Sequence, residues 1–413
     1  MSPRGLPKRI AHFDLDTFFV AVERARDASL VGKPVLVGGR GGRGVVAAAS
    51  YESRVFGCHS AQPMSQALRL CPQAVVVPPD GREYSRVSKL FHQMLRDASP
   101  VVESVGIDEA SVDFTGVPAS RDLARIAGAS DAATIAEHIR GRVRDELRIA
   151  VSVCIAGSRT TAKVGSDRAK PDGLIEVPVG DDASFLAPFA IRELPMVGPK
   201  LGDALRRVGV TTIGDAAELD PRWLETQFGR SGEVLVAHAK GRDGTPVRAG
   251  ARPNRSISRE NTFGEDVTDP RKLRQNLARH AQQVGADLRR GQKRARTVTL
   301  KLRWNNFETL TRSRTLDRPT QSTAGLVLAG EALLNEALRS AGAIRTTSEV
   351  QLSRPVRLIG LGATNIVEDE LQLGLDDLTG DGGVGGELLE ARVDEMLDSL
   401  RERFGDDAVT RGF

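Results

Sequence analysis

The sequence predicts a multidomain α+β protein, and three observations support this prediction. The chain has 413 residues, and a domain commonly holds about 150 residues, so we expect two to four domains. Strand and helix patterns alternate up to residue 173, and a second strand-rich region follows after residue 255. Hydrophobic residues make up 40% of the chain and charged residues 27%, so each domain can bury a core of its own.

The elements of the first half follow from their residue patterns. Residues 9–13 alternate as a strand does, and Asp16 is expected to cap a helix at residues 17–26. A bend at residues 106–109 divides the segment 101–114 into a hairpin. The same rules predict strands at 33–37, 45–49 and 149–155 and helices at 64–70 and 131–147.

The second half of the chain has a different pattern of predicted elements. After residue 173 the pattern is one of short helices broken by glycines, and a glycine turn with an amphipathic helix is expected at 194–208. A connector rich in Pro, Gly and Arg at 241–255 precedes strands predicted at 297–304 and 355–360. A polar helix is expected at 387–403, so the chain should form four folded pieces and a tail.

Charge is strongly segregated, although the net charge is only +4. Residues 270–318 hold 14 Lys or Arg and 3 acidic residues, whereas residues 368–407 hold 14 acidic residues and 3 Arg. Lys301 and Arg303 share one face of a predicted strand, opposite Leu300 and Leu302. We interpret the basic block as a surface for a polyanion rather than as a solvated helix face. Aromatic residues make up only 4% of the chain, so a nucleic acid would be held mainly through its phosphates.

Cysteine usage and hydropathy exclude several classes of protein. The 3 cysteines are scattered without a Cys-x-x-Cys pair, which argues against a disulfide framework and against structural zinc. No segment approaches the ~18 consecutive apolar residues of a membrane span, and the first residues lack the apolar core of a signal peptide. We therefore expect a cytoplasmic protein with no membrane partner.

Two places in the sequence present paired carboxylates. Asp14 and Asp16 follow the first predicted strand, and Asp108 and Glu109 lie in the bend of the hairpin. If neighbouring strands bring them together, carboxylates without His or Cys suit a hard cation such as Mg²⁺. Two such ions serve phosphoryl and nucleotidyl transfer. From the residue types alone, a helix cap and a polar turn explain these residues equally well.

Three further residues fit a triphosphate. Tyr51 and Arg54 follow a predicted strand, and Lys170 lies in a Lys-Pro-Asp-Gly turn. Singly, each is best explained as a surface residue. Together with a divalent cation, a guanidinium and an ammonium would neutralise a triphosphate.

Four segments together resemble the motifs of Y-family DNA polymerases. The first runs from His12 to Glu23 and the second from Ser104 to Asp113. The segments 49–57 and 169–173 are similar to two more motifs, in the family's order. Residues 255–263 and 357–361 are similar to the family's C-terminal DNA-binding domain, so the resemblance extends over about residues 9–365. It is nearest to the bacterial polymerase IV branch.

This resemblance implies a right-hand polymerase fold with a helix-hairpin-helix thumb and an additional β-rich little finger. The domains it implies are a palm at 1–16 and 84–177, fingers at 17–83, a thumb at 178–243, a linker at 244–255, a little finger at 256–364 and an acidic tail at 365–413.

The resemblance also implies an activity and roles for particular residues. The activity is template-directed, low-fidelity DNA synthesis across damaged templates, without proofreading, by two-metal transfer of dNTPs to a primer 3′-hydroxyl. Phe19 matches the steric gate that excludes ribonucleotides, with Phe18 beside it at the nucleotide or in the core, and Asp16 remains a helix cap. The two Mg²⁺ ions, with Mn²⁺ as an alternative, would be held by Asp14, Asp108, Glu109 and the backbone carbonyl of Leu15, and the triphosphate by Tyr51, Arg54 and Lys170.

The expected partners are primer-template DNA, a dNTP and a sliding clamp, for a monomeric enzyme. Gln372, Leu373 and Leu375 resemble a clamp-binding peptide, although Asp376 replaces the usual Phe and an acidic linker with chance leucines explains them too. The DNA-binding residues are expected to include Gly198, Lys200, Arg255, Ser256, Lys301, Arg303 and Arg312.

Two other functions were weighed against this one. A nucleotidyl cyclase also has acidic residues in a palm-like core, but it does not explain the thumb, the basic domain or Phe19. A non-catalytic DNA-binding scaffold should have lost Asp14, Asp108 or Glu109, and all three are present.

Overall fold

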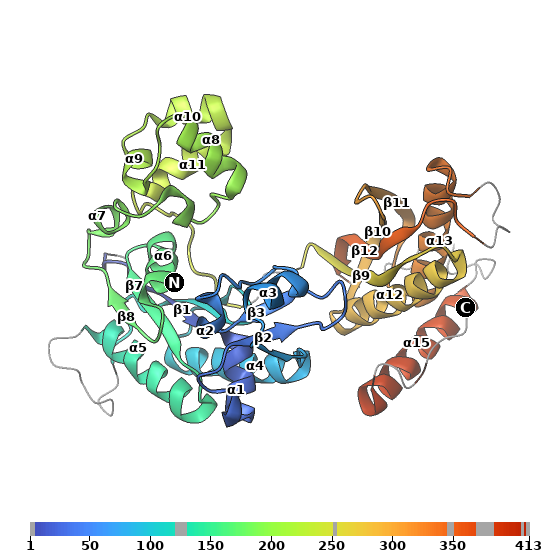
Figure 1. Ribbon diagram of the computed structural model, residues 1–413, viewed down its shortest axis with the longest axis horizontal. Helices are drawn as coiled ribbons and strands as arrows, with labels where there is room; N and C mark the ends of the chain where they lie inside the picture. The colour runs from blue at the N-terminus through green and yellow to red at the C-terminus, as the bar shows by residue number, and fades with distance from the viewer. Residues whose placement is uncertain are drawn as a thin grey trace. The chain divides into compact units, whose positions relative to one another are not determined.

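The computed structural model describes residues 5–119, 130–250, 254–344, 351–368, 384–405 and 409. The chain divides into two compact units, Met1–Ala251 and Arg252–Phe413 (Figure 1). The division falls within the linker expected at 244–255, while the finer division into four domains stays a prediction. Among the helices of the described residues, none is both long and apolar enough to cross a lipid bilayer.

A five-stranded sheet forms the centre of the first unit, in the order β5-β6-β1-β7-β8. The central strand β1 is buried along its whole length and pairs antiparallel with both neighbours. The strands are β1 (Ile10–Leu15), β5 (Val102–Ser104), β6 (Glu109–Asp113), β7 (Val151–Ala156) and β8 (Leu174–Glu176).

The two faces of β1 have different neighbours because successive side chains alternate. Ala11, Phe13 and Leu15 join the main core with helices α4 (Gly81–Ala98) and α5 (Asp131–Arg142). Ile10 belongs to a smaller cluster with residues of α6 (Arg159–Ala169). His12 and Asp14 share the face of Ile10, so their side chains face α6.

A three-stranded sheet in the order β3-β2-β4 forms a second layer of this unit. Its residues and those of α3 make a separate small core that contains Leu36, Met64 and Cys58. The elements between residues 18 and 77 are α1 (Phe18–Arg26), η1 (Ala28–Leu30), β2 (Val35–Gly38), β3 (Val46–Ala49), α2 (Tyr51–Arg54), α3 (Met64–Leu70) and β4 (Val75–Val77).

Short helices after residue 181 enclose a third core that includes Leu194, Leu205 and Leu224. The turn at Gly198 leads directly into an amphipathic helix, as the glycine and proline spacing predicted. The elements between residues 182 and 239 are α7 (Asp182–Leu186), η3 (Ile191–Glu193), α8 (Pro199–Arg207), α9 (Ile213–Ala217), α10 (Pro221–Phe228) and α11 (Arg230–Ala239).

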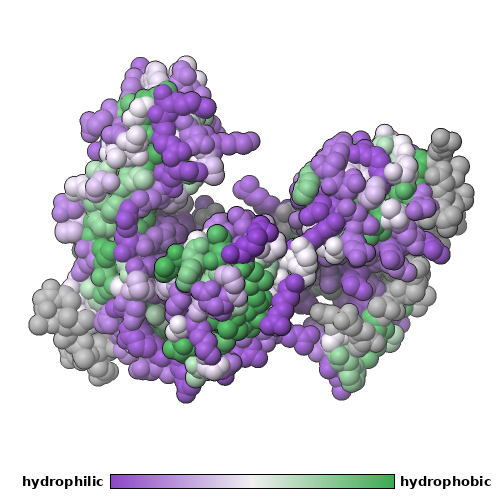
Figure 2. Space-filling view, viewed as in Figure 1, coloured by the Kyte–Doolittle hydropathy of each residue, from purple (hydrophilic) through white to green (hydrophobic). Residues whose placement is uncertain are grey.

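The second unit is an antiparallel sheet in the order β11-β10-β12-β9, covered on one face by two helices. Val298, Leu300 and Leu302 of β10 lie in the core with the helices, which leaves the side chains between them on the other face. In the view of Figure 2 much of the surface of this unit is hydrophilic. Its elements are β9 (Ser256–Val267), α12 (Pro270–Arg290), β10 (Lys293–Trp304), β11 (Thr309–Thr320), α13 (Thr323–Ser340), β12 (Val356–Glu368) and α15 (Val384–Phe404).

The predicted elements are all present, with boundaries that shift by a few residues. The helix predicted at 131–147 ends at Arg142 and continues as a π-helical turn, η2 (Val143–Leu147). One local prediction is wrong: Asp16 does not cap α1. The N-cap position is occupied by Thr17 in a left-handed conformation, with φ 45° and no side-chain cap hydrogen bond.

Candidate active site

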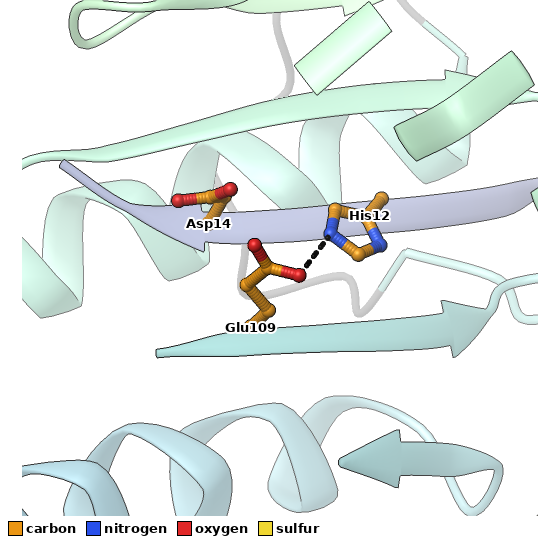
Figure 3. A group of neighbouring side chains, drawn as sticks. All are labelled: His12, Asp14 and Glu109. Atoms are coloured by element: carbon orange, nitrogen blue, oxygen red, sulfur yellow. Dashed lines mark ion pairs between the residues drawn. The ribbon is translucent and has the colours of Figure 1, made fainter. Parts of the chain in front are cut away.

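The carboxylates of Asp14 and Glu109 meet at the ends of β1 and β6, and Asp108 lies in the adjoining bend. Asp14 pairs with Glu109 in the register of the two strands. The backbone N–H of Leu15 donates to the carbonyl oxygen of Asp108 at 3.0 Å, which fixes the bend beside the end of β1. One ligand atom each of His12, Asp14 and Glu109 lies within 4.8 Å of the others (Figure 3). The pairing of β1 with β6 therefore brings Asp14 of the first predicted pair to the hairpin bend of Asp108 and Glu109, whereas Asp16 is bonded to Ser152, Tyr51 and Asp172 instead.

Burial shapes the electrostatics of this cluster. Asp14 is only 3% exposed, and burial raises its pKa against the opposing charges of Lys163 and Lys170. The pKa of Asp108 is also raised, by burial and then by the negative charges of Asp14 and Glu109. Both carboxyl groups would therefore gain from a cation between them.

His12 also contacts this cluster, although the sequence did not mark it as a site residue. Its ring is buried, with Nδ1 3.3 Å from Ser111 Oγ and Nε2 3.5 Å from Glu109 Oε2. Burial lowers the pKa of His12, so the neutral ring is favoured. The contact with His12 and the ion pair with Lys163 hold the pKa of Glu109 well below its usual range.

Two ammonium groups face the carboxylates. Lys163 of α6 places Nζ 3.0 Å from Asp14 Oδ2 and 2.8 Å from Glu109 Oε1. Lys170 places Nζ 2.9 Å from Asp14 Oδ2 and 3.1 Å from Asp167 Oδ1. Burial alone lowers the pKa of Lys163, but the charge of Asp14 and the hydrogen bond to Glu109 raise it overall. Lys170, the residue directly after α6, was expected at this site from the sequence, whereas Lys163 within α6 was not.

Asp16 and Tyr51 meet on the other side of Asp14. The carboxylate of Asp16 is 4% exposed and accepts hydrogen bonds from Ser152 Oγ at 3.0 Å, the Asp172 N–H at 2.7 Å and the Tyr51 hydroxyl at 3.3 Å. Burial and the charge of Asp16 raise the pKa of Tyr51. The Arg54 guanidinium lies 5.3 Å from the centre of the Tyr51 ring, and its Nε donates to the Ala49 carbonyl oxygen at 3.0 Å.

Phe19 and Phe18 separate as residues of an amphipathic helix do. The Phe19 ring is half-buried and stacks on Tyr84, with centroids 4.3 Å apart and an interplanar angle of 12°. Tyr84 is buried, and its hydroxyl donates to Glu23 Oε1 at 2.7 Å. Phe18 is 3% exposed and belongs to the core, so of the two rings only Phe19 is presented at the surface of α1.

Comparison with known proteins relates this site to a family. Residues 13–167 match the impB/mucB/samB family, and residues 254–375 match the C-terminal domain of that family. DNA polymerase IV of Dehalococcoides mccartyi strain 195 is 37% identical over 406 residues, which cover 98% of this chain and 97% of the relative. DNA polymerase IV of Streptomyces coelicolor is 40% identical over 362 residues, 87% of this chain and 71% of the relative.

Solved structures share the fold. A Y-family DNA polymerase chimera of Dbh and Dpo4 superimposes with a TM-score of 0.74 at 24% identity, covering 87% of this chain and 99% of that one. An insertion ternary complex of Dbh DNA polymerase gives a TM-score of 0.60 over the same shares. The chain belongs to the Y family of DNA polymerases.

Family membership confirms the predicted α+β right-hand fold with a C-terminal β-rich domain. As a Y-family member the protein is a DNA-directed DNA polymerase that acts in translesion synthesis. Neither the scaffold nor the cyclase alternative is favoured by these relatives.

In this Y-family polymerase the sheet of the second unit has one face that is not covered by helices. The side chains on this face are polar or small. Lys301 and Arg303 lie on it, as the alternation of β10 predicted. Thr299 pairs with Gly362, and Lys301 pairs with Gly360 on β12. Lys301 Nζ lies 2.7 Å from Glu260 Oε2, and Arg303 Nε donates to Thr309 Oγ1 at 2.9 Å. We call the face that carries Thr299, Lys301 and Arg303, with their pairing partners Ser258, Glu260, Thr309, Thr311, Ser313, Gly360 and Gly362, the outer face.

Other predicted DNA-binding residues lie in different places. Arg312 pairs with Leu300 in the register and approaches Glu336 of α13 at 3.7 Å, so its side chain is on the helix-covered face, opposite Lys301 and Arg303. Arg255 and Ser256 are exposed at the start of β9, and Gly198 and Lys200 are exposed at the start of α8. Gln372, Leu373 and Leu375 lie outside the described residues.

Proposed function

We propose that Asp14, Asp108 and Glu109, with the backbone carbonyl of Leu15, hold two divalent cations for nucleotidyl transfer. The proposal rests on the pairing of Asp14 with Glu109 and on the bend that carries Asp108 beside the end of β1. The carboxylate oxygens suit Mg²⁺, with Mn²⁺ as an alternative. The sequence predicted carboxylates without histidine or cysteine, but His12 is among the clustered residues and adds a ring nitrogen to the donor set. When bound, the cations would make the primer 3′-hydroxyl more acidic and stabilise charge on the reacting phosphates.

The residues around the carboxylates have separate tasks in this proposal. Lys163 keeps Asp14 and Glu109 together while no cation is bound, because its ammonium lies between them. Lys170, Tyr51 and Arg54 bind the triphosphate of the incoming nucleotide. Their positions on a turn beside Asp14 and on α2 support this task, as does the cationic character of two of them.

Phe19 selects the sugar of the nucleotide. Its ring is backed by Tyr84, whose own hydroxyl is tied to Glu23, so the ring has little room to retreat from a ribose 2′-hydroxyl. Phe18 takes part through packing only, since its side chain is buried.

Primer-template DNA is held through its phosphates. Lys301 and Arg303 of the outer face, Arg255 and Ser256 beside it, and the backbone at Gly198 with Lys200 are the proposed contacts. Contacts of this kind carry no sequence information, as a polymerase that copies any template requires.

We also propose a sliding clamp as partner of the cytoplasmic, monomeric enzyme, through Gln372, Leu373 and Leu375. Deleting residues 372–375 should abolish stimulation by the clamp while leaving basal synthesis unchanged. Stimulation that survives this deletion would exclude the motif.

Primer extension tests the proposed function. The protein should add to a labelled primer the dNTP complementary to each template base, and EDTA should stop the reaction. A cyclase would instead release a cyclic nucleotide without primer, and a scaffold would bind the DNA without extending it. Either of these results would overturn the proposal.

A further inference from the structure

Asp16 is a buried carboxylate that three separate parts of the chain share. Ser152 on β7 donates to both of its oxygens at 3.0 Å. The Asp172 N–H donates to Oδ2 at 2.7 Å, and the Tyr51 hydroxyl reaches Oδ1 at 3.3 Å. A phenol, a hydroxyl and a backbone amide therefore meet at a side chain that is 4% exposed.

One of these parts is the turn that presents Lys170. Asp172 has a positive φ of 50°, and its side chain is fixed from the other side by Arg140 and Arg144, each at 2.9 Å from Oδ1. The bond from its N–H to Asp16 closes the turn against the end of β1. The position of Lys170 beside Asp14 thus depends on Asp16 as well as on the two arginines.

Another part is α2. Tyr51 is the first residue of α2, and Arg54 is the last, with its guanidinium against the Tyr51 ring. The Tyr51 hydroxyl is bonded to Asp16 across 35 residues of sequence. The same carboxylate therefore ties α2 to the turn that presents Lys170.

We propose that Asp16 is a positioning residue for the triphosphate, which sets the distance between Tyr51 with Arg54 on α2 and Lys170 on its turn. Asp16 itself does not touch the nucleotide. Because the triphosphate must contact Tyr51, Arg54 and Lys170 at the same time, the loss of this tie should weaken dNTP binding. The inference rests on the proposed function, since that assigns the triphosphate to these residues.

The variants Asp16→Asn and Asp16→Ala distinguish a loss of positioning of the triphosphate-binding residues from a general loss of protein stability. An asparagine oxygen can still accept from the Asp172 N–H, while its NH₂ group can donate to the Tyr51 hydroxyl oxygen. Alanine keeps neither bond. We expect Asp16→Ala to raise KM for dNTP about tenfold or more with kcat within about threefold of wild type, and Asp16→Asn to restore most of the wild-type KM.

A matched control is Asp243→Ala. The Asp243 side chain is 7% exposed and also joins separate elements: it accepts from Thr160 Oγ1 of α6 at 3.1 Å and lies 3.8 Å from His238 Nε2 of α11. Its loss should lower the melting temperature without changing KM for dNTP. A rise of KM in this control equal to that of Asp16→Ala would show a general loss of stability and overturn the inference.

A double-mutant cycle with Tyr51→Phe gives the decisive result. If Asp16 acts by holding Tyr51, the rise in KM caused by Tyr51→Phe in the wild-type background should vanish in the Asp16→Ala background. Additive effects, or a wild-type KM in Asp16→Ala, would overturn the inference. Wild-type primer extension in the same assay tests the proposed function separately, so failure of one is not mistaken for failure of the other.

Discussion

Lys163 gives the sharpest prediction about the cation site. Its ammonium lies 3.0 Å from Asp14 and 2.8 Å from Glu109, where a divalent cation would also bind. In Lys163→Met a side chain of similar length loses this charge. We expect the cation-free protein to become less stable because the carboxylates then repel each other, and we expect divalent cations to bind more tightly because they displace no ammonium.

The magnitude follows from the two distances. Two unit charges about 3 Å apart interact by roughly 5 kcal/mol at an effective dielectric constant of about 20. Desolvation of the ammonium offsets much of this gain, and Lys170 remains beside Asp14. We expect the free energy of cation binding to become more favourable by about 1.4 kcal/mol, which corresponds to about tenfold tighter binding.

The assay measures Mn²⁺ binding to the protein without DNA or dNTP, by the loss of the free Mn²⁺ signal in electron paramagnetic resonance. Melting temperatures are recorded in EDTA and in excess Mg²⁺. Lys163→Arg keeps the charge and should bind Mn²⁺ like wild type, and Lys89→Met removes an exposed lysine of α4 as a control. Unchanged Mn²⁺ affinity in Lys163→Met, together with an unchanged melting temperature in EDTA, would refute the reasoning.

Three further predictions concern the sugar, the protons and the DNA. Phe19→Ala should raise ribonucleotide insertion by orders of magnitude in single-nucleotide extension, and unchanged sugar selectivity would contradict the assignment. The raised pKa values of Asp14 and Asp108 keep these carboxyl groups protonated to higher pH than usual. Activity should therefore fall as the pH is lowered through these pKa values, because the protonated groups bind cations poorly. Protons and cations compete for the same oxygens, so more Mg²⁺ should move this acid limb of the pH profile to lower pH; an immobile limb would argue against cation binding there. Lys301→Ala should make the slope of log K against log salt less negative by about 0.9 for duplex DNA, whereas Arg312→Ala on the helix-covered face should leave it unchanged. Equal changes in both variants would contradict the assignment of DNA to the outer face.

Local sequence patterns were enough to predict that Asp14 lies beside the bend with Asp108 and Glu109. They also predicted the strand that carries Lys301. Asp108 and Glu109 lie in a hairpin bend, and Asp14 ends a strand, so a single antiparallel pairing unites them. The alternation along β10 likewise assigns Lys301 to the face away from the core. In both cases the relevant partner is a neighbouring strand, whose position follows from simple pairing.

The features that local patterns did not predict depend on partners that are distant in sequence. Asp16 has the residue type of a helix cap, but donors 136 and 156 residues away bind it instead. Lys163 lies on a helix whose pattern shows which face is polar but not which carboxylates it meets across the sheet. The face on which the Arg312 side chain lies depends on the register of β11 with β10. A shift of one residue would move every side chain of the strand to the opposite face.

Single-turnover incorporation of one dNTP by Asp108→Ala tests the central claim most directly. The cations are assigned several kcal/mol of transition-state stabilisation, so at 1.36 kcal/mol per tenfold the rate should fall about a thousandfold or more. Asp97→Ala removes an exposed carboxylate that pairs with Arg142 far along the sequence and should keep the wild-type rate. Incorporation by Asp108→Ala within about tenfold of wild type, at the same Mg²⁺ concentration and with DNA binding intact, would contradict the assignment of these carboxylates to catalysis.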